Sequence, residues 1–147
     1  MFGHIIQIMK NIVSITVLGL ILSFTSCKET VVNCEEIFFL DTETVAYNGK
    51  PFTGKCLVKK DSITIEIRSY KKGERSGKWV HFFDNGKINY EGKYRNNELN
   101  GSYKSYYESG QLKAEGEFNE GFYQGPWNFY NSDGSLKEQK VYKVKER

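Results

Sequence analysis

Few residues of this chain have side chains and spacings that could do chemistry. Its 147 residues hold two histidines and three cysteines. His81 lies two residues from Trp79 and two from Phe83, which in a strand places all three on one face. We therefore expect His81 to pack in a core. A metal site built on His and Cys ligands needs three or four of them together, so we expect no metal and no other cofactor.

Two carboxylates could form an acid–base pair. Glu91 and Glu115 are 24 residues apart, and on neighbouring hairpins they would lie roughly 10 Å apart. Carboxylates at such a distance can hydrolyse a glycoside with inversion. Lysines are interleaved with them, however, and the glycines recur with turns instead of forming a phosphate loop. A solvated strand face is the better interpretation, and we expect no enzyme.

The element that positions these residues is a unit of 24 residues. Residues 70–93 recur from Tyr94 and again from Phe118. A fixed period of this length indicates a repeat array. The aromatic positions that recur on one face form the expected repeat core: Trp79, Phe83, Tyr90, Tyr103, Tyr107 and Trp127.

Each unit has the pattern of a β-hairpin. Asn85-Gly86 and its equivalents at Ser109 and Asp133 predict two-residue turns between strands. In that register Phe83 opposes Ile88, His81 opposes Tyr90 and Trp79 opposes Gly92. An aromatic ring then covers the glycine of its own hairpin, as Trp79 over Gly92 and Tyr103 over Gly116.

The opposite face carries a second aromatic row. Phe82, Tyr106 and Tyr130 recur with the period and are flanked by charged residues. Exposed aromatics among charges are typical of a protein-binding surface. The alternative is that each ring covers sheet backbone on a partly wetted face.

Together these features predict an all-β fold, a single-layer antiparallel β-meander or solenoid of about four hairpin repeats of 23–24 residues. The first repeat is degenerate and begins at Tyr47, with Cys56 in place of the aromatic. Its Ile65 and Ile67 match Ile88 and Tyr90 at an offset of 23. The last repeat is polar, as the end of a solenoid requires. Lys and Arg number 21 against 18 Asp and Glu, well mixed along the chain, which argues against nucleic-acid binding.

The repeated motifs resemble the bacterial variant of the MORN repeat, including its antitoxin-like members. The resemblance rests on Gly77-Lys78-Trp79, on residues 82–87 and 106–112, and on Pro51-Phe52-Thr53-Gly54-Lys55. It implies a solenoid used for binding or scaffolding, with a protein partner. Some relatives are labelled antitoxins, so an immunity role is a special case. The alternative is a structural cell-envelope lipoprotein that contacts glycan or lipid headgroups.

Residues 1–26 are predicted to be a signal peptide, with a positive start at Lys10 and an apolar run at residues 12–22. Residues 24–27, Phe-Thr-Ser-Cys, resemble a bacterial lipobox, which implies cleavage before Cys27 and a lipid on its thiol. The alternative is an ordinary signal with a free Cys27. Residues 27–46 would then be a lipidated tether with an initial strand, and residues 47–147 the repeat domain. We expect an exported, outer-membrane-anchored lipoprotein, periplasmic or on the cell surface.

With Cys27 lipidated, two cysteines remain. Cys34 and Cys56 in an exported protein suggest a disulfide that staples the tether to the first repeat. The alternative is a pair of buried thiols.

Overall fold

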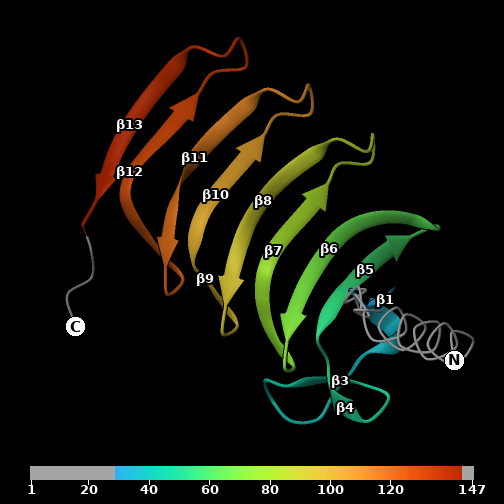
Figure 1. Ribbon diagram of the computed structural model, residues 1–147. Coiled ribbons are helices and arrows are strands. Elements are labelled where there is room, and N and C mark those ends of the chain that lie inside the picture. The colour runs from blue at the N-terminus through green and yellow to red at the C-terminus, as the bar shows by residue number, and fades with distance from the viewer. Residues whose placement is uncertain (1–28, 144–147) are drawn as a thin grey trace, which may run out of the picture.

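The computed structural model describes residues 29–143, which form one open, twisted sheet of hairpins with a small cap at its N-terminal end (Figure 1). The predicted all-β, single-layer hairpin fold is confirmed. Ten strands belong to the main sheet, in the order β1-β5-β6-β7-β8-β10-β11-β12-β13, with β9 paired to β8. The cap adds a three-stranded sheet, β2-β3-β4.

The elements have the following bounds. The cap region holds β1 (Val31–Asn33), the 3₁₀ helix η1 (Cys34–Glu36), β2 (Phe38–Phe39), β3 (Val45–Tyr47) and β4 (Lys50–Pro51). The meander holds β5 (Gly54–Lys60), β6 (Ile63–Lys71), β7 (Glu74–Phe82), β8 (Ile88–Arg95), β9 (Glu98–Leu99), β10 (Gly101–Tyr106), β11 (Leu112–Asn119), β12 (Phe122–Tyr130) and β13 (Leu136–Tyr142).

The turns at the Asn-Gly position differ from the prediction. The N–H of Phe83 donates to the carbonyl of Lys87 and the N–H of Gly86 donates to the carbonyl of Phe83, at 2.8 and 2.9 Å. Gly86 has φ +79°, whereas Asn85 is not left-handed. The loop therefore has three residues instead of two. Its last residue is the left-handed glycine. Asn85 favours this loop because its side chain accepts the N–H of Lys87 at 2.9 Å.

The longer loop shifts the register near the turn only. Phe82, and not Phe83, opposes Ile88, while His81 opposes Tyr90 and Trp79 opposes Gly92 as predicted. The same shift recurs in the next two hairpins. One residue of the second strand is left without a partner each time, as in a β-bulge.

The first hairpin has a shorter turn, and this corrects the predicted face of β6. Asp61 and Ser62 both have positive φ and form a two-residue turn. As a result, residues of β5 lie 23 positions before their equivalents in the next repeat, whereas residues of β6 lie 24 positions before theirs. Glu66 opposes His81 and Arg68 opposes Trp79, so the predicted equivalence of Ile65 and Ile67 with Ile88 and Tyr90 is wrong. A slip of one residue moves every side chain of a strand to the other face.

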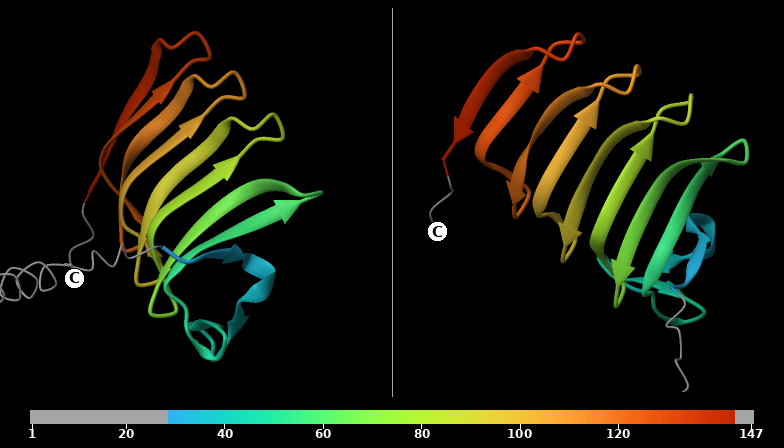
Figure 2. Two further views of the ribbon diagram at one scale, coloured as in Figure 1. Left: turned by 45° about the vertical axis from the view of Figure 1, so that its right-hand side comes forward. Right: turned by 45° about the horizontal axis from the view of Figure 1, so that its top comes forward.

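The initial strand runs parallel to its neighbour, contrary to the predicted antiparallel arrangement. β1 pairs with β5 with Val32 opposite Cys56. The chain leaves β1 through η1, forms the small sheet and returns at β5 (Figure 2), and a connection of this length permits a parallel pair. Cys34 and Cys56 are joined by a disulfide with a Cα–Cα distance of 4.8 Å. The cap buries its own cluster around this bond, made of Val32, Val45, Phe52, Cys56 and Tyr70.

Aromatic rings pack along one face of the meander, which we call the ladder face. The centroid of Trp79 is 4.6 Å from Tyr90, Tyr90 is 6.4 Å from Tyr103, and Tyr103 is 5.7 Å from Trp127. Trp127 lies 6.4 Å from Tyr142 on the last strand and is only 1% exposed. The ladder therefore runs without a break from β7 to β13.

Each glycine of the ladder face is covered by a ring from the following hairpin. The side-chain atoms nearest to a Cβ built on Gly92 belong to Tyr103, and those nearest to Gly116 belong to Trp127. The prediction that the ring comes from the glycine's own hairpin is therefore wrong. Each ring leans back over the preceding strand and packs on the bare backbone of its glycine. This contact between ring and glycine links the strands of the array.

The Gly116→Ala variant tests this packing. A methyl group at this position would overlap the carbon atoms of the Trp127 indole, and overpacking of a filled site typically costs about 1–3 kcal/mol. We expect that loss in the free energy of unfolding, measured with urea. Gly92→Ala is the matched control, because its nearest side-chain atom is 3.3 Å away, so a methyl group there requires a shift of only a few tenths of an ångström. Equal stability of wild type and Gly116→Ala would contradict the packing.

Candidate binding surface

The face opposite the ladder carries the predicted aromatic row, and we call it the charged face. Phe82, Tyr106 and Tyr130 lie on β7, β10 and β12 at equivalent positions. Each is half-buried and not fully exposed as expected. The register places an aliphatic residue opposite each of them, in order Ile88, Leu112 and Leu136. The row is thus a stripe of alternating aromatic and aliphatic side chains.

The tyrosines of the row are fixed by hydrogen bonds to the preceding repeat. The Tyr106 hydroxyl donates to Glu91 Oε1 at 2.9 Å, and the Tyr130 hydroxyl donates to Glu115 Oε1 at 2.8 Å. Partial burial and the bond to Glu91 raise the pKa of Tyr106 to about 12. The bond to Glu115 raises the pKa of Tyr130. Both rings are therefore neutral donors held in a set orientation.

Lysines complete the pattern next to the same carboxylates. Lys78 Nζ lies 2.7 Å from Glu91 Oε2, and Lys104 Nζ lies 3.6 Å from Glu115 Oε2. A groove of about 230 Å³ is lined by Lys78, Glu91 and Lys104, together with Gly92, Lys93 and Ser102. The resulting surface alternates Lys, Glu and Tyr with the period of the repeat.

These contacts argue against acid–base chemistry at the two carboxylates. The pKa of Glu91 is lowered, first by its hydrogen bond to Lys78, and that of Glu115 is lowered, first by its bond to Tyr130. An inverting glycosidase needs one carboxyl whose pKa is raised, so that it can protonate the leaving group. Both groups are instead stabilised as anions, and as anions they accept the tyrosine hydrogen bonds and pair with the lysines of this face.

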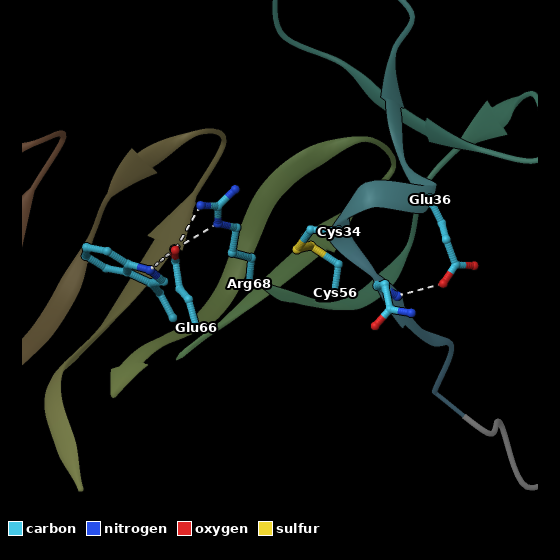
Figure 3. The surroundings of a disulfide bond; sticks show 7 residues. Cys34, Glu36, Cys56, Glu66 and Arg68 are labelled. Atoms are coloured by element: carbon cyan, nitrogen blue, oxygen red, sulfur yellow. Dashed lines mark hydrogen bonds and ion pairs between the residues drawn. A yellow bond between two sulfur atoms is a disulfide. The ribbon is translucent and has the colours of Figure 1, made fainter. Parts of the chain in front are cut away.

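The ladder face contains a polar cluster that the sequence analysis missed. Glu66 is only 9% exposed and accepts hydrogen bonds from Nε and Nη2 of Arg68, both at 2.8 Å (Figure 3). Trp79 Nε1 donates to the same carboxylate at 2.6 Å. Burial raises the pKa of Glu66, but the bonds from Arg68 and Trp79 outweigh it and lower the pKa. The missed signal was the shorter turn at Asp61-Ser62, which moves Glu66 to the ladder face.

His81 closes this cluster on the other side. It opposes Glu66 across the strands and stacks on Tyr90 with ring centroids 4.6 Å apart. Its Nδ1 atom is buried and has no hydrogen-bond partner within residues 29–143. The packed position agrees with the expected core role of His81.

A second hollow lies between the cap and the first hairpin. It has a volume of about 420 Å³. Its charged side chains are Glu35, Lys59, Asp61 and Arg68, two acids and two bases. This mixed lining favours neither an anionic nor a cationic ligand.

The N-terminal predictions lie outside the described residues. These are the signal peptide at 1–26 and the lipidation of Cys27. Within residues 29–143 no helix is long and apolar enough to cross a membrane. The same residues contain no group of three or more His, Cys, Asp or Glu side chains placed to hold a metal ion.

The Glu66→Gln variant tests the polar cluster. The amide cannot neutralise Arg68, which keeps 29% of its side chain exposed, so we expect a loss of about 2–3 kcal/mol in the free energy of unfolding at pH 7, less than for a fully buried pair. The folded-state pKa of Glu66 is lowered from 4.5, so its stabilisation is present above that value and is lost as the pH falls through the folded pKa. The gap between wild type and variant should therefore narrow below about pH 4.

Urea unfolding at pH 7 and pH 3 measures the loss of unfolding free energy in the variant and how far this loss decreases at low pH. Glu115→Gln is the control, because its side chain is 30% exposed and should cost under about 1 kcal/mol. The same loss for Glu66→Gln at both pH values would show that the carboxylate charge is not what stabilises the cluster.

Comparison with known proteins places two of the hairpins in a recognised repeat type. The family model described as MORN repeat variant matches residues 75–96 and 99–120, which span β7 to β11. MORN repeats are commonly modules that bind membranes or ligands, and they are not a known enzyme family. Neither the search of curated proteins nor the search of solved structures found a match. Two consecutive repeats of this sheet therefore match the MORN repeat variant.

Proposed function

We propose that this chain is a non-enzymatic, membrane-anchored binding protein whose charged face takes up a protein partner. The observation that carries the proposal is the periodic stripe of Phe82, Tyr106 and Tyr130, set among ionised Lys–Glu pairs. The match to a repeat type used for binding supports it.

The hydrogen bonds of the stripe favour recognition. Tyr106 and Tyr130 are already held by Glu91 and Glu115, so little side-chain freedom is lost when a partner covers the rings. Prior ordering of this kind reduces the entropic cost of association. The alternating lysines and carboxylates then form a polar rim, which orients a partner and rejects others through charge.

The repeat spacing defines what the partner must match. Neighbouring repeats are two strands apart, which corresponds to about 10 Å. A partner that contacts the whole stripe therefore presents apolar groups at intervals of about 10 Å, with acidic and basic groups beside them. An antitoxin or immunity protein that covers a toxin is one form of this proposal.

A lipid on Cys27 would set the position of this surface relative to the membrane. The described chain begins at Glu29 and the cap follows directly, so the cap would lie next to the bilayer. The sheet would then extend outwards, with its strands stacked at about 4.8 Å each. Counted in strands from β1, Phe82 on β7 would lie about 14 Å and Tyr130 on β12 about 34 Å along the sheet, at the disposal of a soluble or surface-bound partner.

The stripe is tested by cross-linking capture with the full chain, expressed in its host and purified in a mild detergent. We expect wild type to capture one protein and the triple variant Phe82→Ser, Tyr106→Ser, Tyr130→Ser to lose it. The matched control changes Phe38, Phe39 and Leu40 to Ser, since these exposed apolar residues lie in or next to β2 of the cap, away from the stripe. Circular dichroism confirms that each variant is folded.

The outcomes separate the candidate functions. Equal capture by wild type and the stripe variant would contradict the proposal. If no protein is captured while the chain sediments with purified cell-wall material, and the stripe variant does not, the structural envelope role is favoured over protein binding.

The anchor is tested separately with labelled palmitate. We expect wild type to incorporate label and to pellet with membranes, and Cys27→Ser to lose both properties because it has no thiol to acylate. Cys34 and Cys56 are joined to each other, so they offer no alternative thiol. Label retained in Cys27→Ser would refute lipidation at this residue.

A further inference from the structure

The two ends of the main sheet differ. At the N-terminal end, β5 is covered by β1, and the cap is fixed there by the Cys34–Cys56 disulfide. At the C-terminal end, β13 pairs with β12 on one side and with no strand of residues 29–143 on the other (Figure 1). An open strand edge presents unpaired backbone groups to any chain that can add a strand.

A proline shows which groups of β13 point to the open edge. Pro126 opposes Val141, and proline has no N–H, so these two residues cannot exchange backbone hydrogen bonds. In an antiparallel pair the N–H and C=O of Val141 must then point away from β12. Alternation gives Gln139 the same direction. Val141 is 74% exposed and Gln139 is exposed as well, which agrees with a place on the open edge.

Exposed apolar side chains gather near the same edge. Phe122, Tyr123, Leu136 and Val141, all on β12 and β13, are between 47% and 74% exposed. Between residues 64 and 121 no large hydrophobic side chain is exposed to that extent. The other exposed large hydrophobic residues belong to the cap region and the first hairpin, at the opposite end of the sheet: Val31, Phe38, Phe39, Leu40 and Ile63. A cluster of exposed apolar groups beside an open strand edge is typical of an interface.

We propose that two copies of this chain associate through β13, edge to edge and antiparallel, with Gln139 of each copy on the two-fold axis. Each copy then continues the sheet of the other. The interface is closed, because both copies use the same strand and the β13 edge of each copy is paired.

The charges of β13 select this register. In a symmetric antiparallel pair, the axis passes through one residue and its copy. An axis at Glu138 places two carboxylates opposite each other, and an axis at Lys140 places two ammonium groups opposite each other. An axis at Gln139 places Glu138 opposite Lys140 of the second copy, twice. Opposite charges across a strand pair stabilise it, and like charges destabilise it.

The geometry brings these charges close. Gln139 and Val141 hold the outward backbone groups, so Glu138 and Lys140 fall in the pairs that are not hydrogen-bonded across the new interface, where side chains are nearest. Within one chain, Lys140 Nζ already lies 3.3 Å from Glu138 Oε2, with both side chains about half exposed. Association would join two such pairs into a cluster of four alternating charges.

A charge-swap series tests the register. The molecular mass of the full chain is measured by sedimentation equilibrium in density-matched detergent. We expect wild type to reach twice the mass of one chain at micromolar concentration. Glu138→Lys should weaken association by about tenfold or more, and so should Lys140→Glu, since each creates two like-charge contacts. The double variant Glu138→Lys, Lys140→Glu restores opposite charges and should return to the wild-type dissociation constant within about threefold.

Three outcomes would overturn the proposal. These are a wild-type chain that stays monomeric at 100-fold higher concentration, a dimer unaffected by the single changes, and a double variant as weak as the single ones. Lys137→Glu on the same strand is the control for general loss of positive charge, because Lys137 opposes Val141 in the proposed register, and it should associate as wild type does. Circular dichroism verifies that every variant is folded.

Discussion

A sheet one layer thick has no second layer in which to bury side chains, and contact between rings on neighbouring strands must take its place. In this protein the rings lean back onto glycines of the preceding hairpin, as Trp127 does over Gly116. The arrangement works because glycine leaves the backbone open and the ring covers it, so one residue buries what the other exposes. Trp127 is thereby almost completely buried, although no sheet of residues 29–143 packs above it. Each repeat depends on its neighbours, as expected for a repeat array.

At the N-terminal end of the array the pattern changes, because the hairpin before Trp79 has no glycine for its ring to cover. Arg68 stands opposite Trp79 where later repeats have glycine, and Glu66 binds both of them. A buried carboxylate is costly unless its oxygen atoms accept hydrogen bonds, and three hydrogen bonds satisfy them here. Beyond this cluster the disulfide and the small cap replace the aromatic ladder. The polar cluster is thus the junction between two different ways of building a core.

The sequence was enough to predict the period, the fold and the parity of β7, because each rests on recurring residues such as Trp79 and Trp127. It was not enough for features that depend on turn length. Asn85-Gly86 fits both a two-residue and a three-residue loop, and only the backbone bond from Gly86 to Phe83 distinguishes them. The turn at Asp61-Ser62 is one residue shorter than the later turns and places Glu66 on the ladder face. Residue propensities do not predict an acidic side chain on a face of packed aromatic rings. The half-buried state of Tyr106 also depends on a bond to the preceding repeat, which a single repeat does not reveal.

The disulfide determines how a tethered molecule would carry mechanical load. Force applied through the residues before Cys34 passes along β1 and then reaches Cys56 on β5 through a covalent bond. The residues from η1 to β4 lie on a closed loop between the two cysteines and bear none of that force. The part of the cap after Cys34 is therefore shielded from tension. The first noncovalent contacts to be loaded are those between β1 and β5, and the contacts between β5 and β6 are loaded past the disulfide.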